Sequence, residues 1–210
     1  GGMEQFRKRY IDNSMIDVLV KEREAGRIRR VGWSFHGDIE VYDYALQMHY
    51  RGEVHWDFVQ IQLNYVDWKH ASGSNFKAEY LYDELAKRKI PAVIMEPLLG
   101  GRLSNVPDHI VARLKQREPE RSGASWAFRD AGCPQDVLTG LSGMTYMEQL
   151  QDNIRTYSPL VPLTEEETQY LYDTADLMME YPTIPGNDCK YCMPCPYGID
   201  IPAILIHYNK

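Results

Sequence analysis

Short apolar segments alternate with amphipathic segments of helical spacing along most of this sequence. The strand-like segments are centred near residues 31, 60, 93 and 138. Each is followed by a segment in which apolar residues recur every three or four positions, as Ile39, Tyr42 and Leu46 do after the first strand. Strands separated by such crossovers pair in parallel. The alternation therefore predicts an α/β protein with a parallel sheet and crossover helices.

The expected elements fill most of the chain. Strands are predicted at residues 30–35, 58–63, 91–95 and 136–140. Helices are predicted at 14–26, 38–52, 76–89, 108–118, 122–132, 147–155, from Thr164 into the region before residue 182, and at 201–208, with a polar loop at 67–74. In the helix at 147–155, Met147, Leu150 and Ile154 share one face. We expect that face to point inward.

Two architectures accommodate four parallel strands with crossover helices: an open doubly wound sheet, and half of an eight-stranded barrel. A complete barrel needs about 250 residues, whereas this chain has 210 residues. A half-barrel exposes both of its edge strands, and an exposed edge is a template for pairing with another chain. We therefore expect a stable half-barrel to form a homo-oligomer.

The chain is acidic, with a formal net charge of -7 and an isoelectric point of about 5.4. Binding to nucleic acid or to anionic lipid depends on a basic surface, so this balance argues against both and favours small-molecule chemistry. No apolar run approaches the roughly 18 residues of a membrane span, and the first residues lack the features of a signal peptide. We expect a cytoplasmic protein that contacts no membrane.

Three of the four cysteines, Cys189, Cys192 and Cys195, lie close together near the end of the chain. In a reducing compartment, such clustered thiols indicate metal or iron–sulfur ligation rather than disulfides. Their spacing, with Pro196 after the last thiol, is that of thiolates that hold a [4Fe–4S] cluster in bacterial segments. Zinc and inert buried thiols are the alternatives, and both zinc and the cluster normally take four ligands.

Four segments carry a resemblance to a known family. They are GRIRRVGWSF at 26–35, VQIQLNY at 59–65, MEPLLGG at 95–101, and the stretch from Thr139 to Asn153. In order and spacing, they resemble strand ends and loops of the aldo/keto reductase family over about residues 14–156. The cysteine-rich tail resembles that of an iron–sulfur-containing branch of these oxidoreductases.

The resemblance implies the C-terminal half of a TIM-type (β/α)8 barrel, followed by helices and a Cys-rich tail. It divides the chain into a half-barrel at 3–156, a helical extension at 157–181 and the tail at 182–210. It also implies binding of NADP or NAD and hydride transfer to a small carbonyl substrate. The family's acid–base residues, an Asp, a Tyr, a Lys and a His, lie on the first four strands, and no residue here matches them. We therefore assign no catalytic residue and expect this chain alone to be inactive.

The resemblance places the nicotinamide end of the cofactor at three strand ends. Ser34 and Gln60 match positions that hydrogen-bond the nicotinamide carboxamide, and Met95 falls where many members stack an aromatic ring on the nicotinamide. Fixed polar groups of this kind present one face of the ring to the substrate. Without the resemblance, Ser34 and Gln60 are ordinary polar residues at strand ends, and Met95 is an ordinary core residue.

Other matched positions belong to the phosphate and adenosine end. They are Leu98, Gly100, Gly101 and Arg102 in one loop, and Gly143, Met144, Thr145, Gln149, Asp152 and Asn153 around the helix at 147–155. The loop would wrap the pyrophosphate or form a plain turn, and the helix would direct its N-terminus at the adenosine phosphate. Asp152 and Asn153 match the pair that contacts adenine. Gln149 stands where some members carry an Arg for the 2′-phosphate, which leaves NAD and NADP open.

The tail departs from the related tails at one position. Those tails carry another cysteine three positions before the first thiol, and Gly186 stands there in this chain. The fourth ligand would then be Cys133, Asp188 or His207, or the cluster would be held by three thiolates. A cluster would transfer electrons to or from the cofactor or act as a structural staple.

Two other functions are compatible with the sequence. The first is a non-catalytic half-barrel module that self-associates and uses the cysteine tail as a structural metal site. The second is a ferredoxin-like electron carrier on an α/β scaffold. Nucleotide binding distinguishes the oxidoreductase from both of these functions.

Overall fold

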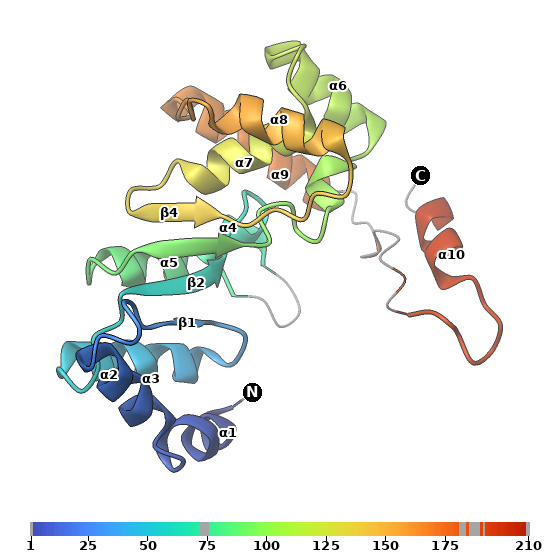
Figure 1. The fold of residues 1–210 in the computed structure, drawn as a ribbon. Helices are drawn as coiled ribbons and strands as arrows, with labels where there is room; N and C mark the ends of the chain where they lie inside the picture. The colour runs from blue at the N-terminus through green and yellow to red at the C-terminus, as the bar shows by residue number, and fades with distance from the viewer. Residues whose placement is uncertain (1, 72–75, 181–183, 185–189, 191, 209–210) are drawn as a thin grey trace. The chain divides into compact units, whose positions relative to one another are not determined.

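The chain folds into two compact units that interleave along the sequence (Figure 1). A computed structural model describes residues 2–71, 76–180, 184, 190 and 192–208. The first unit, here called the sheet unit, comprises Gly1–Leu63, Asp67–Met95 and Pro134–Leu141. The second, the helical unit, comprises Asn64–Val66, Glu96–Cys133 and Ser142–Lys210.

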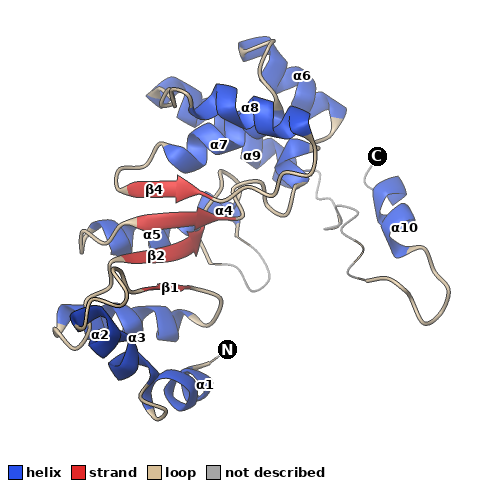
Figure 2. Cartoon of the chain, in the orientation of Figure 1, coloured by secondary structure: helices blue, strands red, loops and turns tan. Residues whose placement is uncertain are grey.

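The sheet unit holds four parallel strands in the order β1-β2-β3-β4 (Figure 2). The strands are β1 (Gly32–Ser34), β2 (Phe58–Gln62), β3 (Ala92–Met95) and β4 (Val137–Gly140). The helices of this unit are α1 (Met3–Phe6), α2 (Met15–Glu24), α3 (Ile39–Tyr50), α4 (Asp67–His70) and α5 (Ala78–Ala86), with a π-helical turn, η1 (Arg7–Ile11), after α1. Strands that neighbour one another in the sheet follow one another in the chain, as in the wall of a β/α barrel.

The two faces of the sheet differ in burial. On β2, Val59 and Ile61 are fully buried, whereas Phe58, Gln60 and Gln62 are half-buried. Successive strand residues point to opposite faces, so one face of β2 lies in the core, where the strand contacts α5. The opposite face, which carries Gln60, remains partly open.

Among its described residues, the helical unit contains a 3₁₀ turn, η2 (Arg102–Ser104), followed by five helices. These are α6 (Asp108–Arg117), α7 (Gly123–Gly132), α8 (Met147–Tyr157), α9 (Glu165–Glu180) and α10 (Ile201–Tyr208). The core of this unit consists of Tyr65, Val66, Leu103, Val106, Ile110, Leu114, Trp126, Ala127, Leu171 and Ala175. Ser122 caps α7, because its hydroxyl accepts a hydrogen bond of 2.9 Å from the Ser125 amide.

The structure confirms the four predicted strands and the predicted helices, with bounds that shift by a few residues. Three differences stand out. The predicted loop at 67–74 begins with α4, and residues 3–11 form α1 and η1, which the sequence analysis did not predict. The third difference concerns α8, whose apolar face was expected to point inward.

That expectation for α8 is wrong. Met147, Leu150 and Ile154 are 62%, 37% and 52% exposed. The buried residue of α8 is Thr156, whose Oγ1 lies 2.9 Å from Ser125 Oγ on α7. Hydroxyl hydrogen bonds on the polar side of α8 therefore turn its apolar side outward. Across the described residues, every helix is too short or too polar to cross a lipid bilayer.

Candidate functional site

Three of the predicted cofactor residues meet on the open face of the sheet unit. Ser34 is paired in register with Gln60, and Gln60 is paired with Val93, two residues before Met95. The Gln60 amide Nε2 donates to Ser34 Oγ at 3.2 Å and lies 3.4 Å from Met95 Sδ. Ser34 and Met95 are the last residues of β1 and β3, so the group lies toward the carboxyl ends of the parallel strands.

The chemistry of this group suits an amide ligand. Gln60 offers a donor and an acceptor on one planar group, and the Ser34 hydroxyl can take either role. The bond between the two side chains satisfies them in the free chain, and Ser34 is exposed. A carboxamide that arrives from solvent can therefore exchange with this bond. Met95 is 7% exposed and supplies an apolar contact beside them.

The predicted pyrophosphate loop lies in the helical unit and is closed by its own hydrogen bonds. Leu103 N donates to Leu98 O at 3.0 Å. Gly100 and Gly101 have φ angles of 65° and 89°, which glycine adopts without steric cost. The amide of Gly100 donates to the carboxylate of Glu96. Glu96 was not among the predicted residues, and it accepts from an N–H group of the loop that was predicted to wrap a pyrophosphate.

A second set of amides lies where α8 begins, also in the helical unit. Gln149 Oε1 accepts from Thr145 N at 2.7 Å and from Tyr146 N at 3.1 Å. Gln149 thus caps its own helix, in the manner of a capping box. A Cβ atom added at Gly143 would have no other atom within 4 Å, so the backbone before this helix is accessible.

Asp152 and Asn153 lie on the inner side of α8 and are held by serine hydroxyls. Ser122 Oγ donates to Asp152 Oδ2 at 2.5 Å, and Asn153 Nδ2 donates to Ser142 Oγ at 3.0 Å. Arg155 Nη2 lies 3.3 Å from the other carboxylate oxygen of Asp152. Neither serine was predicted from the sequence as a partner of these residues, although Ser122 is the first residue of the helix predicted at 122–132, where capping serines are common.

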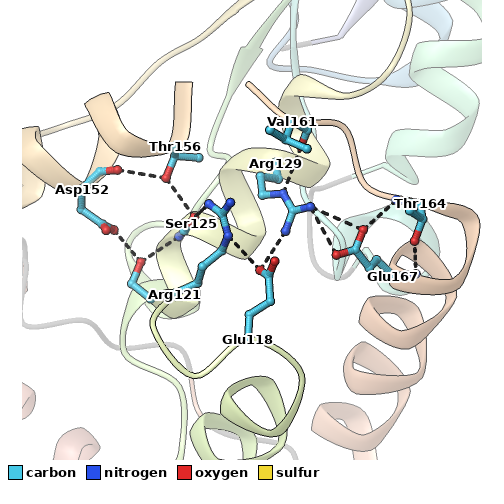
Figure 3. Close-up of polar contacts among 10 residues, drawn as sticks. Glu118, Arg121, Ser125, Arg129, Asp152, Thr156, Val161, Thr164 and Glu167 are labelled. Carbon is cyan, nitrogen blue, oxygen red and sulfur yellow. Dashed lines mark hydrogen bonds and ion pairs between the residues drawn. The ribbon is translucent and has the colours of Figure 1, made fainter. Parts of the chain in front are cut away.

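A chain of polar contacts continues from Asp152 through the helical unit (Figure 3). Arg121 links Ser125, at 3.3 Å, to Glu118, at 2.9 Å. Glu118 also pairs with Arg129 at 2.9 Å, and Arg129 reaches Glu167 at 3.3 Å. The side chain of Arg129 is only 3% exposed, so its charge is compensated by two carboxylates rather than by water. These contacts fix α7 against the ends of α6 and α9.

One buried carboxylate in this unit has an unsatisfied oxygen. Asp130 on α7 is 6% exposed, and its Oδ2 has no hydrogen-bond partner among the described residues. Burial raises the pKa of Asp130 to about 7. Asp130 contributes to the core of the unit rather than to the group that contains Asp152.

The cysteines divide into one isolated thiol and the tail. Cys133 is the C-cap residue directly after α7 and is half-buried. Its Sγ accepts from Leu163 N at 3.1 Å, and burial raises the pKa of the thiol. In the tail, Cys192 is an exposed free thiol and Cys195 a half-buried one, whereas Cys189 lies outside the described residues. The described residues contain no group of three or more His, Cys, Asp and Glu side chains with metal-binding geometry.

A cavity of about 460 Å³ lies in the sheet unit, lined by Arg23, Gly26, Ile28, Arg29 and Arg30. These residues precede β1, so the cavity is at the amino end of that strand, whereas Ser34 is at its carboxyl end. Arg23 and Arg30 lie 3.4 Å and 3.7 Å from the carboxylate of Asp57. Two of the three arginines of this cavity, Arg23 and Arg30, therefore pair with Asp57, and the cavity is separate from the predicted nicotinamide group.

Comparisons with known proteins find similar folds but no similar sequence. Searches of family models and of curated proteins gave no match. Among solved structures, the chain is similar to the aldo-keto reductase AKR11C1 from Bacillus halodurans, holo form, with a TM-score of 0.59 and 18% identity over 78% of this chain and 56% of that one. An aldo-keto reductase from Klebsiella pneumoniae in complex with NADPH is similar with a TM-score of 0.54 and 17% identity, over 74% of this chain and 51% of that one. The glycerol dehydrogenase AKR11B4 from Gluconobacter oxydans is similar with a TM-score of 0.56 and 15% identity, over 80% of this chain and 55% of that one.

These similarities define the fold of the chain as part of a (β/α)8 barrel of the aldo-keto reductase type. The chain spans a little over half the length of the matched structures. Together with the parallel four-stranded sheet, this agrees with the half-barrel expected from the sequence, rather than with the open doubly wound sheet.

Proposed function

We propose that this chain is the C-terminal part of an NAD(P)H-dependent oxidoreductase of the aldo-keto reductase type. The observation that carries the proposal is the convergence of Ser34, Gln60 and Met95 toward the carboxyl ends of parallel strands. In β/α barrels, ligands bind at this end of the strands. One of the matched structures contains NADPH. A nicotinamide nucleotide is therefore the first ligand to test.

In this proposal the chain binds and orients the cofactor. Gln60 and Ser34 hold the carboxamide, so that one face of the nicotinamide is presented for hydride transfer to a small carbonyl substrate. We assign no acid–base residue to this chain. We therefore expect the chain alone to bind nucleotide without reducing a carbonyl.

We propose the remaining matched residues for the other parts of the nucleotide. Leu98, Gly100 and Arg102 are proposed for the pyrophosphate, Gly143, Thr145 and Gln149 for the adenosine phosphate, and Asp152 and Asn153 for adenine. Since the amides of Gly100 and Thr145 already bond to Glu96 and Gln149, a bound phosphate must displace these side chains. This displacement costs binding energy and predicts modest affinity.

Titration of the chain with NADH and NADPH, followed by nicotinamide fluorescence, tests the proposal. Gln60→Ala removes the group that bridges Ser34 and Met95, and losing one neutral hydrogen bond of about 1 kcal/mol should weaken binding about fivefold. Gln47→Ala is the matched control, because it makes the same change at an exposed position of α3. The proposal is wrong if the folded chain binds neither nucleotide, or if both variants bind as wild type does.

We further propose that Cys189, Cys192 and Cys195 bind an iron–sulfur cluster in a cytoplasmic protein. Free thiols at Cys192 and Cys195 suit this ligand chemistry. When bound, the cluster would supply one-electron transfer or a structural link. Iron and acid-labile sulfide analysis after anaerobic purification should detect both elements, with loss of both in Cys192→Ser. Loss in Cys133→Ser as well would identify Cys133 as the fourth ligand, and retention would exclude it. Zinc, or no metal at all, would refute the cluster.

A non-catalytic module with a structural metal site is the second candidate. The observation that favours it is the internal satisfaction of the phosphate-facing amides by Glu96 and Gln149. This candidate predicts that neither nucleotide binds, whereas removal of the metal lowers stability. The titration above therefore separates the two functions.

A further inference from the structure

The cavity that lies before β1 concentrates positive charge. Its wall consists of three arginines, one glycine and one apolar residue, all within the sheet unit: Arg23, Gly26, Ile28, Arg29 and Arg30. The ten residues from 21 to 30 carry five basic and two acidic side chains. The whole chain, by contrast, has a net charge of -7. The cavity is therefore a locally basic site on an acidic chain.

Two of the arginines are oriented by one carboxylate. Arg23 and Arg30 lie 3.4 Å and 3.7 Å from oxygens of Asp57. Arg23 also donates to the His55 carbonyl at 2.7 Å. Asp57 in turn accepts from the Val31 amide at 2.7 Å. These contacts orient two guanidinium groups before a ligand arrives, which reduces the entropy that binding costs.

The third arginine, Arg29, has no counter-charge. Its side chain is exposed, and within the described part of the chain its guanidinium makes no hydrogen bond or ion pair. The three guanidinium groups of the cavity and the one carboxylate, that of Asp57, together carry a net charge of +2. Arg27, which is not part of the cavity wall, has its own ion pair with Glu22. A ligand with two negative charges would balance the site.

The end of α2 beside the cavity does not oppose an anion. A helix C-terminus carries partial negative charge on its last carbonyl groups. Here the turn around Gly26 satisfies three of these carbonyls, because the amides of residues 25–28 donate to them. Gly26 has a φ angle of 72°, and a Cβ atom added there would have no other atom within 4 Å. The turn therefore offsets the charge of the helix end and leaves open space beside the arginines.

We propose that this cavity binds the dianionic phosphate of a small organic phosphomonoester. Guanidinium groups hold phosphate oxygens through paired, charge-assisted hydrogen bonds. The cavity volume of about 460 Å³ lies in the range of small-molecule sites and leaves room beyond one phosphate group. Ile28 offers an apolar contact to the organic part of the ligand. Because the cavity lies at the amino end of β1 and Ser34 lies at its carboxyl end, this ligand is distinct from the nicotinamide.

The test is a titration of the whole chain with glycerol 3-phosphate, followed by phosphorus NMR at pH 8 and constant ionic strength. At this pH the phosphate is dianionic. Wild type should bind saturably, with a Kd of about 1 mM or tighter. Arg29→Gln should weaken binding at least about tenfold, because it removes charge-assisted hydrogen bonds. Arg27→Gln is the matched control: it removes the same charge from the same turn, outside the cavity wall, and should change the Kd less than about twofold.

Four results would overturn the proposal. The absence of saturable binding to wild type would refute it without recourse to variants. Equal losses in Arg29→Gln and Arg27→Gln would assign the binding to the general charge of the turn. Inorganic phosphate that binds as tightly as glycerol 3-phosphate would refute an organic ligand. Weakened binding of NADPH, but not of NADH, to Arg29→Gln would assign the phosphate to the cofactor.

The proposal is independent of the oxidoreductase function. We expect Arg29→Gln to bind NADH and NADPH as wild type does, whereas Gln60→Ala tests the nicotinamide group at the other end of the strands. Failure of one titration therefore leaves the other interpretable. Circular dichroism verifies that Arg29→Gln is folded, as its exposed position predicts.

Discussion

Replacement of Asp130 by asparagine should stabilise the chain, and increasingly so as the pH rises. Asp130 is buried in the core of the helical unit with one oxygen unsatisfied, and burial raises its pKa from 3.8 to about 7. Each unit of pKa difference between folded and unfolded states corresponds to about 1.4 kcal/mol. The ionised carboxylate therefore costs the folded state about 4 kcal/mol once both states are deprotonated.

The direction of the pH dependence follows from the raised pKa. Below pH 3.8, both states carry a protonated Asp130, and its titration costs no stability. Between pH 3.8 and about 7 the unfolded state loses its proton first, so stability falls by about 1.4 kcal/mol for each pH unit. Above about pH 7 the loss is complete. Asparagine has no proton to lose, so Asp130→Asn removes this part of the pH dependence.

Urea denaturation of wild type and Asp130→Asn at pH 5 and pH 8 measures the effect. We expect the difference in unfolding free energy between the two proteins to grow by about 2.5 kcal/mol from pH 5 to pH 8 in favour of the variant. Asp83→Asn, at an exposed position of α5, is the control and should follow wild type at both values. Equal pH profiles for wild type and Asp130→Asn would show that Asp130 is ionised in the folded chain at an ordinary pKa.

Two further predictions concern packing and charge. Gly32→Ala would place a Cβ 2.6 Å from Phe58 O on the neighbouring strand, so we expect the free energy of unfolding, measured by urea denaturation, to fall by about 2 kcal/mol or more. An unchanged denaturation midpoint would mean that β1 and β2 separate easily. Arg129→Met leaves Glu167 without its arginine and Glu118 with Arg121 alone, and should lower the free energy of unfolding by about 1–3 kcal/mol. Arg155→Met, at an exposed ion pair, should change stability by less than about 1 kcal/mol, and equal losses in these two variants would contradict the burial argument.

The fold was predictable because its signal is local and repeated. Each strand is a short apolar run bounded by polar residues, and each helix has its own apolar spacing, so order and type follow without knowledge of contacts. The face of α8 was not predictable in the same way. Spacing shows that Met147, Leu150 and Ile154 share a side, but which side is buried depends on Ser122 and Ser125, far away in sequence.

The candidate site was predictable in part for a similar reason. Strand ends follow from the strand pattern, and parallel pairing brings Ser34 and Gln60 into register. The bonds made by Glu96 and Gln149 depend on loop backbone angles and side-chain rotamers, which no spacing rule encodes. The sequence therefore indicated the loops that are proposed for the phosphates, but not the side chains that accept hydrogen bonds from their amides.

The interleaving of the two units has a consequence for synthesis on the ribosome. Residues 96–133 of the helical unit separate β3 from β4 in the chain. During translation, the first three strands are complete while β4 is still unmade, so the nascent sheet waits with the β3 edge open. Unpaired edges of this kind promote aggregation of folding intermediates. The interval between β3 and β4 is therefore a stage at which the nascent chain exposes an unpaired strand edge.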